Sequence, residues 1–403
     1  MAFFNPFRPS YVEDPYPALA RLRADDPVFR SRELDGWVLT RHADCAYVLR
    51  EQALFGNDPT TASGGMRAHV QEARAKSPLG SAPTLGAADP PIHPRLRDLI
   101  GRAFTPRMVE EERVVAAAIA GTLLDEVPAG QPFEFMSRIA EPLPVIVISD
   151  LLGLDDDERG PVRAWAQALV RVIAGGELPP EAYLEAEAAK AALLDFLRSY
   201  AARHAGDTGK KVISILVAAE AQGDRLSIDE LLLFTVFLYT AGSGPTAYML
   251  GNALAALLAH PTALEAVRAD RSLLRVALEE SLRWDSATQV LLRFAREDCE
   301  VGGRKITRGD TLYVMVGAAH RDPAVFGNPD VFDIGRSITN TQLLAFGAGP
   351  HFCLGQPLAF VEGEAALGAL LDRYPHLQGV PGGMERGGTF LLRGPRRLLL
   401  AGR

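Results

Sequence analysis

One cysteine stands in a segment that can change its chemistry. Cys353 lies in Phe346-Gly-Ala-Gly-Pro-His-Phe-Cys-Leu-Gly355, where glycines on both sides allow close backbone approach and leave N–H groups free to point at sulfur. A helix-forming run, Leu358–Asp372, follows directly, so the positive end of that helix is expected near the thiol. Both features favour thiolate over thiol. A single cysteine is usually an inert buried thiol, but the features of this segment do not fit that role.

The surroundings of Cys353 also limit the kind of site it can form. Gly347-x-Gly349 alone is a weak signal for a phosphate-binding turn, because no strand–loop–helix unit surrounds it. No second Cys or His follows at the spacing of a metal cluster. A hydrogen-bonded thiolate on such a turn suits single axial ligation of haem iron.

Composition excludes several classes of protein. The chain has 403 residues, 48% hydrophobic and 23% charged, which is close to the globular average and excludes disordered and fibrous proteins. Its net charge of −8 disfavours nucleic acid as a partner, because phosphate binding needs clustered positive charge. Three scattered cysteines exclude a disulfide framework. The start, Met1–Phe7, shows no signal peptide, so a cytoplasmic location is expected.

The elements that must position Cys353 include one long apolar helix. Leu231–Ala259 carries no formal charge, and Ser227 with Glu230 forms a capping box before it. Length alone would suit a membrane span. However, Gly242-Ser-Gly-Pro-Thr246 interrupts the run and no Lys/Arg cluster flanks it, so we expect a helix buried in the centre of the protein instead. Pro245 removes one helical N–H, and the distortion suggests that something sits against the helix.

The rest of the chain is mostly helical, with a minor sheet from distant segments. We expect a single domain over residues 1–403, because no composition shift marks a linker, and a long loop over Gly56–Pro91 with one short helix. Apolar periodicity predicts helices at Tyr16–Ala24, Pro94–Arg102, Arg107–Glu126, Asp157–Ile173, Pro180–Ala205 and Leu264–Trp284. Short strands are predicted at Gly36–Thr40, Val290–Phe294, Thr311–Val316, Gly388–Leu392 and Arg397–Leu400, within β-rich regions of about 28–45, 288–320 and 376–403.

The cysteine segment resembles the haem-binding loop of the cytochrome P-450 superfamily, whose signature F-x-x-G-x-x-x-C-x-G is matched by Phe346, Gly349, Cys353 and Gly355. The resemblance extends over essentially the whole chain. It includes an E-x-x-R pair, the A-G of the long I helix and the H-x-x-x-R of soluble bacterial members, matched by Glu280 and Arg283, Ala241 and Gly242, and His93 and Arg97. Cys45 and Cys299 match no motif and are expected to be structural.

The resemblance implies a mainly α fold with a small β subdomain and a long central helix over a buried haem. The implied cofactor is haem b with Cys353 as the axial thiolate to iron, and electrons come from NAD(P)H through ferredoxin reductase and ferredoxin. A soluble monomer without a membrane anchor is expected, with Arg102 and Arg107 contributing to a positive docking face. The implied haem contacts are His93, Arg97, Ala241, Arg293, Phe346, Gly347, His351, Cys353 and Gly355, and the implied substrate contacts are Val172, Tyr239, Gly242, Val290, Leu291 and Phe390.

The sequence departs from the family at two places. Relatives place an acid and a threonine after A-G-x, to relay the protons that oxygen cleavage needs; here Gly244 and Pro245 stand there, and neither side chain can relay a proton. The remaining candidates are Ser243, Thr246, Thr240 and a water held by the Ala241 carbonyl. Val331 replaces an arginine that usually completes the E-x-x-R network, and Arg336 or Arg321 could substitute for it.

Three functions follow from this comparison. The first is a monooxygenase that oxidises a hydrophobic small molecule of natural-product type, with protons delivered by substrate or water. The second is atypical chemistry: peroxide-driven oxidation, oxidative coupling, cyclisation or desaturation. The third is a non-enzymatic helper protein of the same fold, although such helpers commonly lose the cysteine loop that this chain retains.

Overall fold

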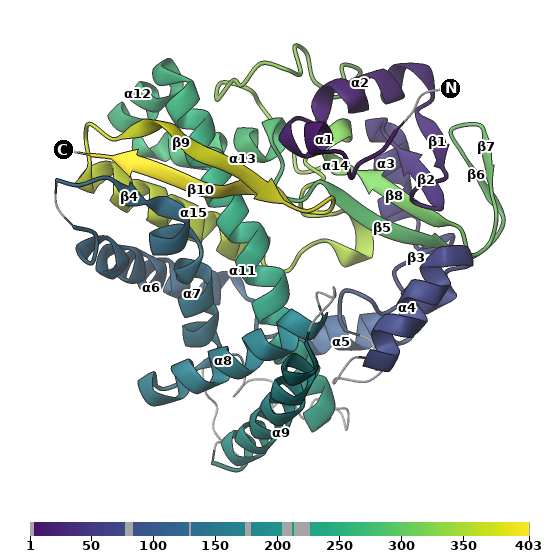
Figure 1. The fold of residues 1–403 in the computed structure, drawn as a ribbon, viewed down its shortest axis with the longest axis horizontal. Helices are drawn as coiled ribbons and strands as arrows, with labels where there is room; N and C mark the ends of the chain where they lie inside the picture. Colours follow the sequence, from purple (N-terminus) through teal and green to yellow (C-terminus); the bar gives the residue numbers. More distant parts are fainter. Residues whose placement is uncertain are drawn as a thin grey trace.

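A 32-residue helix, α11 (Ile228–Ala259), runs through the middle of the molecule (Figure 1). The predicted capping box is confirmed: the Glu230 amide donates to Ser227 Oγ (3.2 Å) and the Ser227 amide donates to Glu230 Oε2 (2.8 Å). The helix continues through Pro245, and most of its length is buried. Among the described residues, no helix is both long and apolar enough to cross a bilayer.

The computed structural model describes residues 4–76, 84–128, 130–173, 179–203, 212 and 226–402. Helices dominate these residues, and α11 contacts several of them, including α7, α13 and α15. The other α-helices are α1 (Pro9–Glu13), α2 (Tyr16–Asp25), α3 (His42–Arg50), α4 (Gly64–Lys76), α5 (Ile92–Gly101), α6 (Pro106–Asp125), α7 (Pro142–Leu152), α8 (Asp156–Ile173), α9 (Pro180–Arg203), α12 (Pro261–Ala269), α13 (Leu274–Trp284), α14 (Val316–Ala319) and α15 (Gln356–Arg373).

Three small sheets complete the described part of the fold. The largest has the order β1-β2-β8-β5-β3, with only β2 and β8 parallel. The second has the order β4-β10-β9, and β6 pairs with β7 in a hairpin. The strands are β1 (Val28–Ser31), β2 (Gly36–Leu39), β3 (Phe55–Gly56), β4 (Phe133–Glu134), β5 (Val290–Ala295), β6 (Cys299–Val301), β7 (Arg304–Ile306), β8 (Thr311–Met315), β9 (Gln378–Gly388) and β10 (Arg393–Ala401).

Several sequence predictions need correction. The helix predicted over Leu264–Trp284 is two helices, because Asp270 ends α12 and its carboxylate accepts the Ser272 amide (2.9 Å) that opens a short 3-10 turn before α13. The strand predicted at Gly388–Leu392 is wrong, since Thr389–Leu392 forms the turn between β9 and β10. Helix α3 occupies the end of the predicted β-rich region 28–45, whereas the helix expected within residues 56–91 is present as the 13-residue α4.

Candidate functional site

The cysteine loop is folded by two glycines and one backbone hydrogen bond. The Cys353 amide donates to the Phe346 carbonyl (2.9 Å), which closes the loop. Gly347 and Gly349 have φ angles of +75° and +70°, a conformation that residues with a Cβ rarely adopt. A Cβ at Gly349 would also lie 2.9 Å from Arg50 Cα, so the loop packs directly on the end of α3. These contacts explain why the segment is rich in glycine.

The sulfur of Cys353 faces the first turn of α15. The backbone N–H groups of Gly355 and Gln356 point at it, as the sequence predicted. Burial nevertheless raises the pKa of Cys353, and these two N–H groups and the nearby Arg97 only partly oppose that effect. The two N–H groups therefore favour the thiolate, as predicted, while desolvation acts against them. A metal cation in contact with the sulfur would remove the proton.

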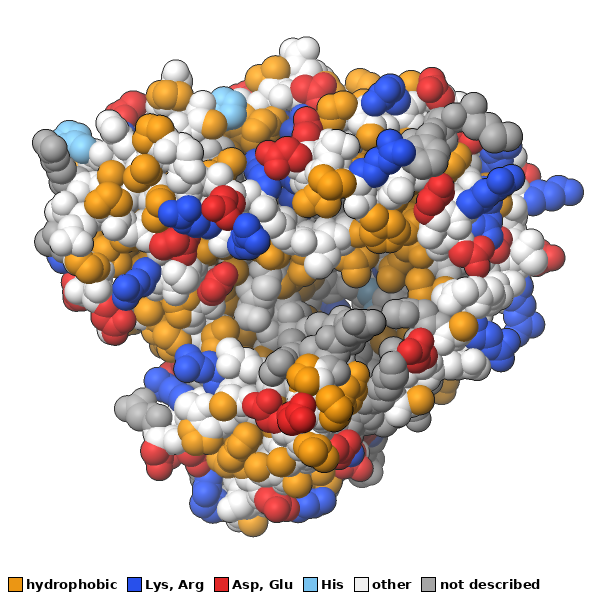
Figure 2. Space-filling view, in the orientation of Figure 1, with side chains coloured by type: hydrophobic (Ala, Val, Ile, Leu, Met, Phe, Trp, Pro, Cys, Tyr) orange, Lys and Arg blue, Asp and Glu red, His pale blue; other side chains and the backbone are white. Residues whose placement is uncertain are grey.

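A cavity of about 310 Å³ separates the cysteine loop from α11. A second space of about 150 Å³ shares Cys353, Ala241 and Gly242 with it. Figure 2 shows that the molecule is hollowed near its centre. The larger cavity is lined by residues from α11, α13, β5, the cysteine loop, α15 and the connecting segments: Asn57, Gly86, Phe237, Ala241, Gly242, Pro245, Thr246, Met249, Leu282, Ala287, Thr288, Leu291, Arg293, Ala345, Phe346, Gly347, His351, Cys353, Gly355 and Ala359.

Four basic side chains, His93, Arg97, Arg293 and His351, line one edge of these two adjoining spaces. His93 and His351 stack with ring centroids 3.8 Å apart, and the Nε2 atom of each is buried without a hydrogen-bond partner. Burial and the neighbouring His93, Arg293 and Arg97 lower the pKa of His351 to about 3. Burial also lowers the pKa of Arg293 to about 10, against the opposing charge of Asp89. Among the described residues, no carboxylate forms an ion pair with these four side chains.

The site therefore has the parts that haem b requires. Arg293 is buried and Arg97 half-buried without a carboxylate partner among the described residues, so an anionic group would complete this cluster. The two haem propionates supply such a partner, and His93, Arg97, Arg293 and His351 would hold them. Cys353, on the cavity wall, would be the axial ligand to iron. The predicted contacts Ala241, Phe346, Gly347 and Gly355 line the same cavity.

The hydroxyl groups proposed as proton relays lie on different faces of α11. Ser243 Oγ donates to the Tyr239 carbonyl, and Thr240 Oγ1 donates to the Val236 carbonyl (2.8 Å), so both are engaged by their own helix. Thr246 is buried and lines the cavity beside Pro245. Gly242 also lines the cavity, and a Cβ there would meet Ile148 of α7 at 2.9 Å.

The residues predicted to bind substrate separate into two groups. Leu291 and Gly242 line the cavity. Tyr239 points to α7, where its hydroxyl bonds Ser149 Oγ (2.9 Å), and Val290 faces a second core with Phe390. Val172 is buried in the main core. Among the described residues, Tyr239, Val290, Phe390 and Val172 therefore lie outside the lining of the cavity.

Sequence reasoning missed part of the α11 face that lines the cavity. Phe237 and Met249 line it together with Ala241 and Pro245. These four residues follow one another at intervals of four, which places them on one face of a helix. Helical spacing from Ala241 in both directions could have identified Phe237 and Met249. The lining residues Leu282, Ala345 and Ala359 come from distant segments and had no such signal.

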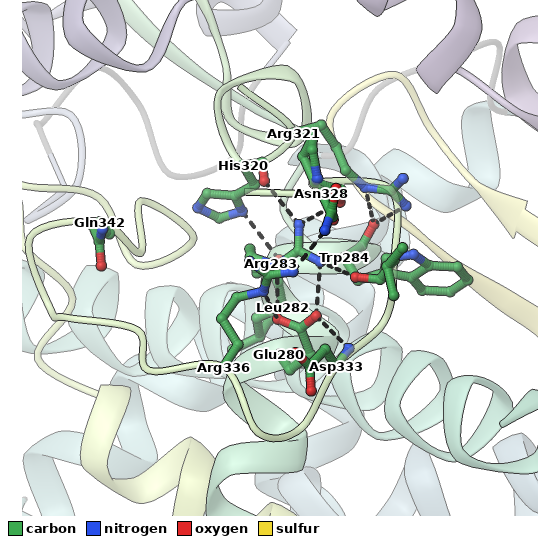
Figure 3. Close-up of polar contacts among 12 residues, drawn as sticks. Glu280, Leu282, Arg283, Trp284, His320, Arg321, Asn328, Asp333, Arg336 and Gln342 are labelled. Carbon is green, nitrogen blue, oxygen red and sulfur yellow. Dashed lines mark hydrogen bonds and ion pairs between the residues drawn. The ribbon is translucent and has the colours of Figure 1, made fainter. Parts of the chain in front are cut away.

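The E-x-x-R pair forms a buried bidentate ion pair on α13 (Figure 3). Arg283 Nε and Nη2 donate to the two carboxylate oxygens of Glu280 at 2.7 Å each, and both side chains are almost completely buried. The remaining donors of Arg283 reach the carbonyls of His320, Pro329 and Val331. The pair therefore fastens α13 to the irregular chain that leads to the cysteine loop.

The open question about Val331 is answered by Arg336. Arg336 Nε lies 3.4 Å from Glu280 Oε2, and its other donors reach the carbonyls of Gly327 and Asn328. Arg321 instead bonds the Trp284 carbonyl and the Asp330 carboxylate (2.7 Å). Arg336 thus supplies the second cation beside Glu280 (Figure 3).

Known proteins with the same architecture support this interpretation. The family described as "Cytochrome P450" matches residues 184–396. The chain is 35% identical over 373 residues to "Putative cytochrome P450 123" of Mycobacterium tuberculosis, covering 92% of this chain and 89% of that protein. It is 35% identical over 379 residues to "6-deoxyerythronolide B hydroxylase" of Saccharopolyspora erythraea, covering 91% and 90%.

Solved structures of other proteins have the same fold. The fold matches that of CYP109E1 from Bacillus megaterium in complex with corticosterone with a TM-score of 0.85 and 27% identity, covering 98% of this chain and 99% of that chain. The haem-thiolate cofactor is typical of the family to which these proteins belong. The cysteine loop, the basic cluster and these similarities together show that the chain belongs to the cytochrome P450 family and is a cytochrome P450 monooxygenase.

Proposed function

We propose that this monooxygenase oxidises a neutral, hydrophobic small molecule of natural-product type. The observation that carries the proposal is the lining of the cavity next to Cys353. Away from the basic cluster the cavity presents mainly apolar side chains, with Asn57, Thr246 and Thr288 as polar groups. The relative named 6-deoxyerythronolide B hydroxylase acts on a compound of this class by its name. An apolar lining with few polar groups selects a ligand by shape and by one or two hydrogen bonds.

The chain's own residues divide the work of the reaction. Haem with a thiolate ligand, when bound, activates oxygen with electrons supplied from outside the protein. Cys353 would ligate the iron, and the four basic residues would hold the propionates. The α11 face with Phe237, Ala241 and Gly242 forms the opposite wall, which excludes water and orients the substrate.

We propose Thr246 Oγ1 as the side-chain proton relay. Gly244 and Pro245 offer no donor, and Ser243 and Thr240 donate to carbonyls of their own helix. Thr246 is the α11 hydroxyl that lines the cavity in the described part of the chain. Pro245 has no N–H for the Ala241 carbonyl, so that oxygen can accept a hydrogen bond from a water next to Thr246.

A variant series tests the relay. We expect Thr246→Ala to lower the product formed per NAD(P)H consumed by at least about tenfold. This factor is smaller than the usual contribution of general acid–base catalysis to a rate. Turnover driven by hydrogen peroxide, which already carries its protons, is expected to change little. Ser243→Ala is the matched control. Equal losses in both variants, or an equal loss with peroxide, would contradict the role of Thr246.

Electrons are proposed to come from NAD(P)H through ferredoxin reductase and ferredoxin. A surface groove next to the basic cluster is lined by Arg97, Asp98, Arg102 and Pro350. Arg102 pairs with Asp98 (2.6 Å) and Arg107 pairs with Glu111 (3.0 Å), so their charges are partly neutralised. An acidic ferredoxin docked at this groove would lie close to the propionates.

The proposed function is tested by comparing two oxidant systems on one panel of compounds. Binding difference spectra against macrolactone and steroid compounds identify ligands, and each is then offered with ferredoxin, reductase and NAD(P)H or with hydrogen peroxide. The proposal expects oxygen insertion into a neutral ligand with the ferredoxin system. Turnover with peroxide alone would indicate the atypical chemistry, and binding restricted to anionic ligands would contradict the proposed substrate class.

A further inference from the structure

Two aromatic rings connect the cysteine loop to the interior of α15. The rings of Phe346 and Phe360 lie with centroids 5.3 Å apart at an angle of 53°. Phe360 is fully buried in α15, and Phe346 begins the cysteine loop. The carbonyl of Phe346 accepts the Cys353 amide (2.9 Å). A shift of the Phe360 ring therefore reaches the hydrogen bond that closes the cysteine loop, because buried side chains are densely packed.

An arginine lies over the ring of Phe360. The guanidinium carbon of Arg275 lies 3.5 Å from the centroid of the Phe360 ring, a close cation–π contact. Arg275 Nε donates to Glu279 Oε1 (2.8 Å), and Nη1 lies 3.9 Å from Glu364 Oε1. Glu364 Oε2 in turn accepts from Arg113 of α6 (2.6 Å). The guanidinium is thus held over the ring by acids from α13 and α15.

The place of Arg275 in its helix is unfavourable by itself. It is the second residue of α13, where the helix dipole disfavours a cation. Its side chain is 41% exposed, so solvent could accommodate it elsewhere. The ring contact and the two acids account for its position over Phe360.

We propose that Arg275 is a positioning residue for the axial thiolate, acting through Phe360 and Phe346 on the loop that holds Cys353. The proposal rests on the haem-thiolate chemistry proposed above. The cation fixes the Phe360 ring, that ring supports Phe346, and the Phe346 carbonyl holds the Cys353 amide. Loss of the cation leaves the Phe360 ring, and with it the loop that holds Cys353, free to move.

The test measures how long the thiolate stays on the iron. In the reduced carbon monoxide complex, the thiolate-ligated form and the form that has lost the thiolate ligand absorb at different wavelengths. We expect Arg275→Met to convert to the second form about two- to fivefold faster than the wild type, the factor of a cation–π contact. Phe360→Leu, which removes the ring, is expected to do the same, and Arg275→Lys is expected to restore part of the lifetime.

Arg271→Met is the matched control. Arg271 lines the same surface groove as Arg275 and pairs with Asp372 (2.9 Å), and none of the aromatic contacts found for the described residues involves it. We expect this variant to keep the wild-type conversion rate. Equal rates for the Arg275→Met and Arg271→Met variants, or a fall in melting temperature without a change in rate, would overturn the proposal.

Failure of this inference can be told apart from failure of the proposed function. A wild-type protein that never forms a thiolate-ligated carbon monoxide complex contradicts the haem-thiolate chemistry itself. A wild type that forms it, with an unchanged Arg275→Met variant, contradicts only the role of Arg275. If Arg275→Met does not fold, Phe360→Leu and Arg275→Lys decide by the same measurement.

Discussion

Two clusters of polar side chains in this protein differ in how their polar groups are satisfied. Glu280 and Arg283 satisfy one another within α13, so their burial is balanced without any bound group. The cluster of His93, Arg97, Arg293 and His351 has no such balance among the described residues. The first arrangement needs no bound group, whereas the second is completed by an anionic ligand. The difference separates a structural motif from a binding site.

Removing Arg283 is predicted to be severely destabilising. Arg283→Ala leaves the buried Glu280 carboxylate with only the more distant Arg336 as a cation, and we expect a loss of about 3–5 kcal/mol in the free energy of unfolding. Chemical denaturation of the haem-free proteins measures it. The control is Arg373→Ala, whose exposed pair with Asp125 spans 3.6 Å and contributes about 0–1 kcal/mol. Similar losses in both variants would contradict a structural role of the buried pair.

At the scale of elements, the residues of α11 that line the cavity lower the stability of the helix. Pro245 lies inside the helix and lines the cavity, although proline removes a helical hydrogen bond. Gly242 lies nearby because α7 approaches too closely for a side chain. The helix is locally less stable where it lines the cavity beside Thr246, which suggests that the distortion serves the site.

Restoring the helical hydrogen bond is predicted to stabilise the protein. We expect Pro245→Ala to raise the free energy of unfolding by about 2 kcal/mol, the cost of an interior proline less the entropy it removes from the unfolded chain. Thermal unfolding of the haem-free variant measures this. In Gly244→Ala the new Cβ would meet only Leu392, at 4.0 Å, so a gain of about 0.5–1 kcal/mol is expected there. Unchanged stability in Pro245→Ala would show that another group already compensates for the missing N–H.

Some of the helices and strands could be predicted from the sequence, and others could not. The long helix and its capping box were predictable, because Ser227, Glu230 and an uncharged apolar run are local signals. The break at Asp270 was not recognised, since a single capping side chain interrupts a continuous apolar pattern. Gly388–Leu392 was predicted as a strand, but Thr389 forms turn hydrogen bonds with Leu391 and Leu392.

The site was predictable where its residues are close in sequence. Cys353, His351 and the glycines share one loop, and His93 and Arg97 share one helical face. The lining residues from separate elements depend on packing that no local pattern encodes. Tyr239, for example, turned toward Ser149 of α7 and away from the cavity.

At the scale of the whole molecule, the site depends on contacts between elements distant in sequence. Helix α5 carries His93 and Arg97, and α11 forms the opposite wall of the cavity. Arg95 of α5 bonds both oxygens of Glu230 at the start of α11, at 2.6 and 3.3 Å. This ion pair connects the segment that would hold the propionates to the central helix.

The ion pair predicts a pH dependence of stability. Burial raises the pKa of Glu230, but hydrogen bonds from Arg95 and Ser227 outweigh it and leave the pKa below its ordinary value. A carboxyl with a depressed pKa stabilises the fold above its unfolded pKa of about 4.3, and this contribution is lost as pH falls through the folded pKa. We expect the difference in unfolding free energy between wild type and Glu230→Gln to be constant from pH 7 to about 5 and to shrink below about 4.3. A difference that stays constant down to pH 3 would contradict the assignment.

The central claim is that Cys353 binds the iron of haem as a thiolate, and one absorbance measurement tests it directly. Haem-loaded wild-type protein and Cys353→Ser are reduced under carbon monoxide, and their difference spectra are compared. We predict the spectrum of a thiolate-ligated complex for the wild type and its complete absence in the variant. A wild-type protein without that spectrum, or a variant that retains it, would contradict the account.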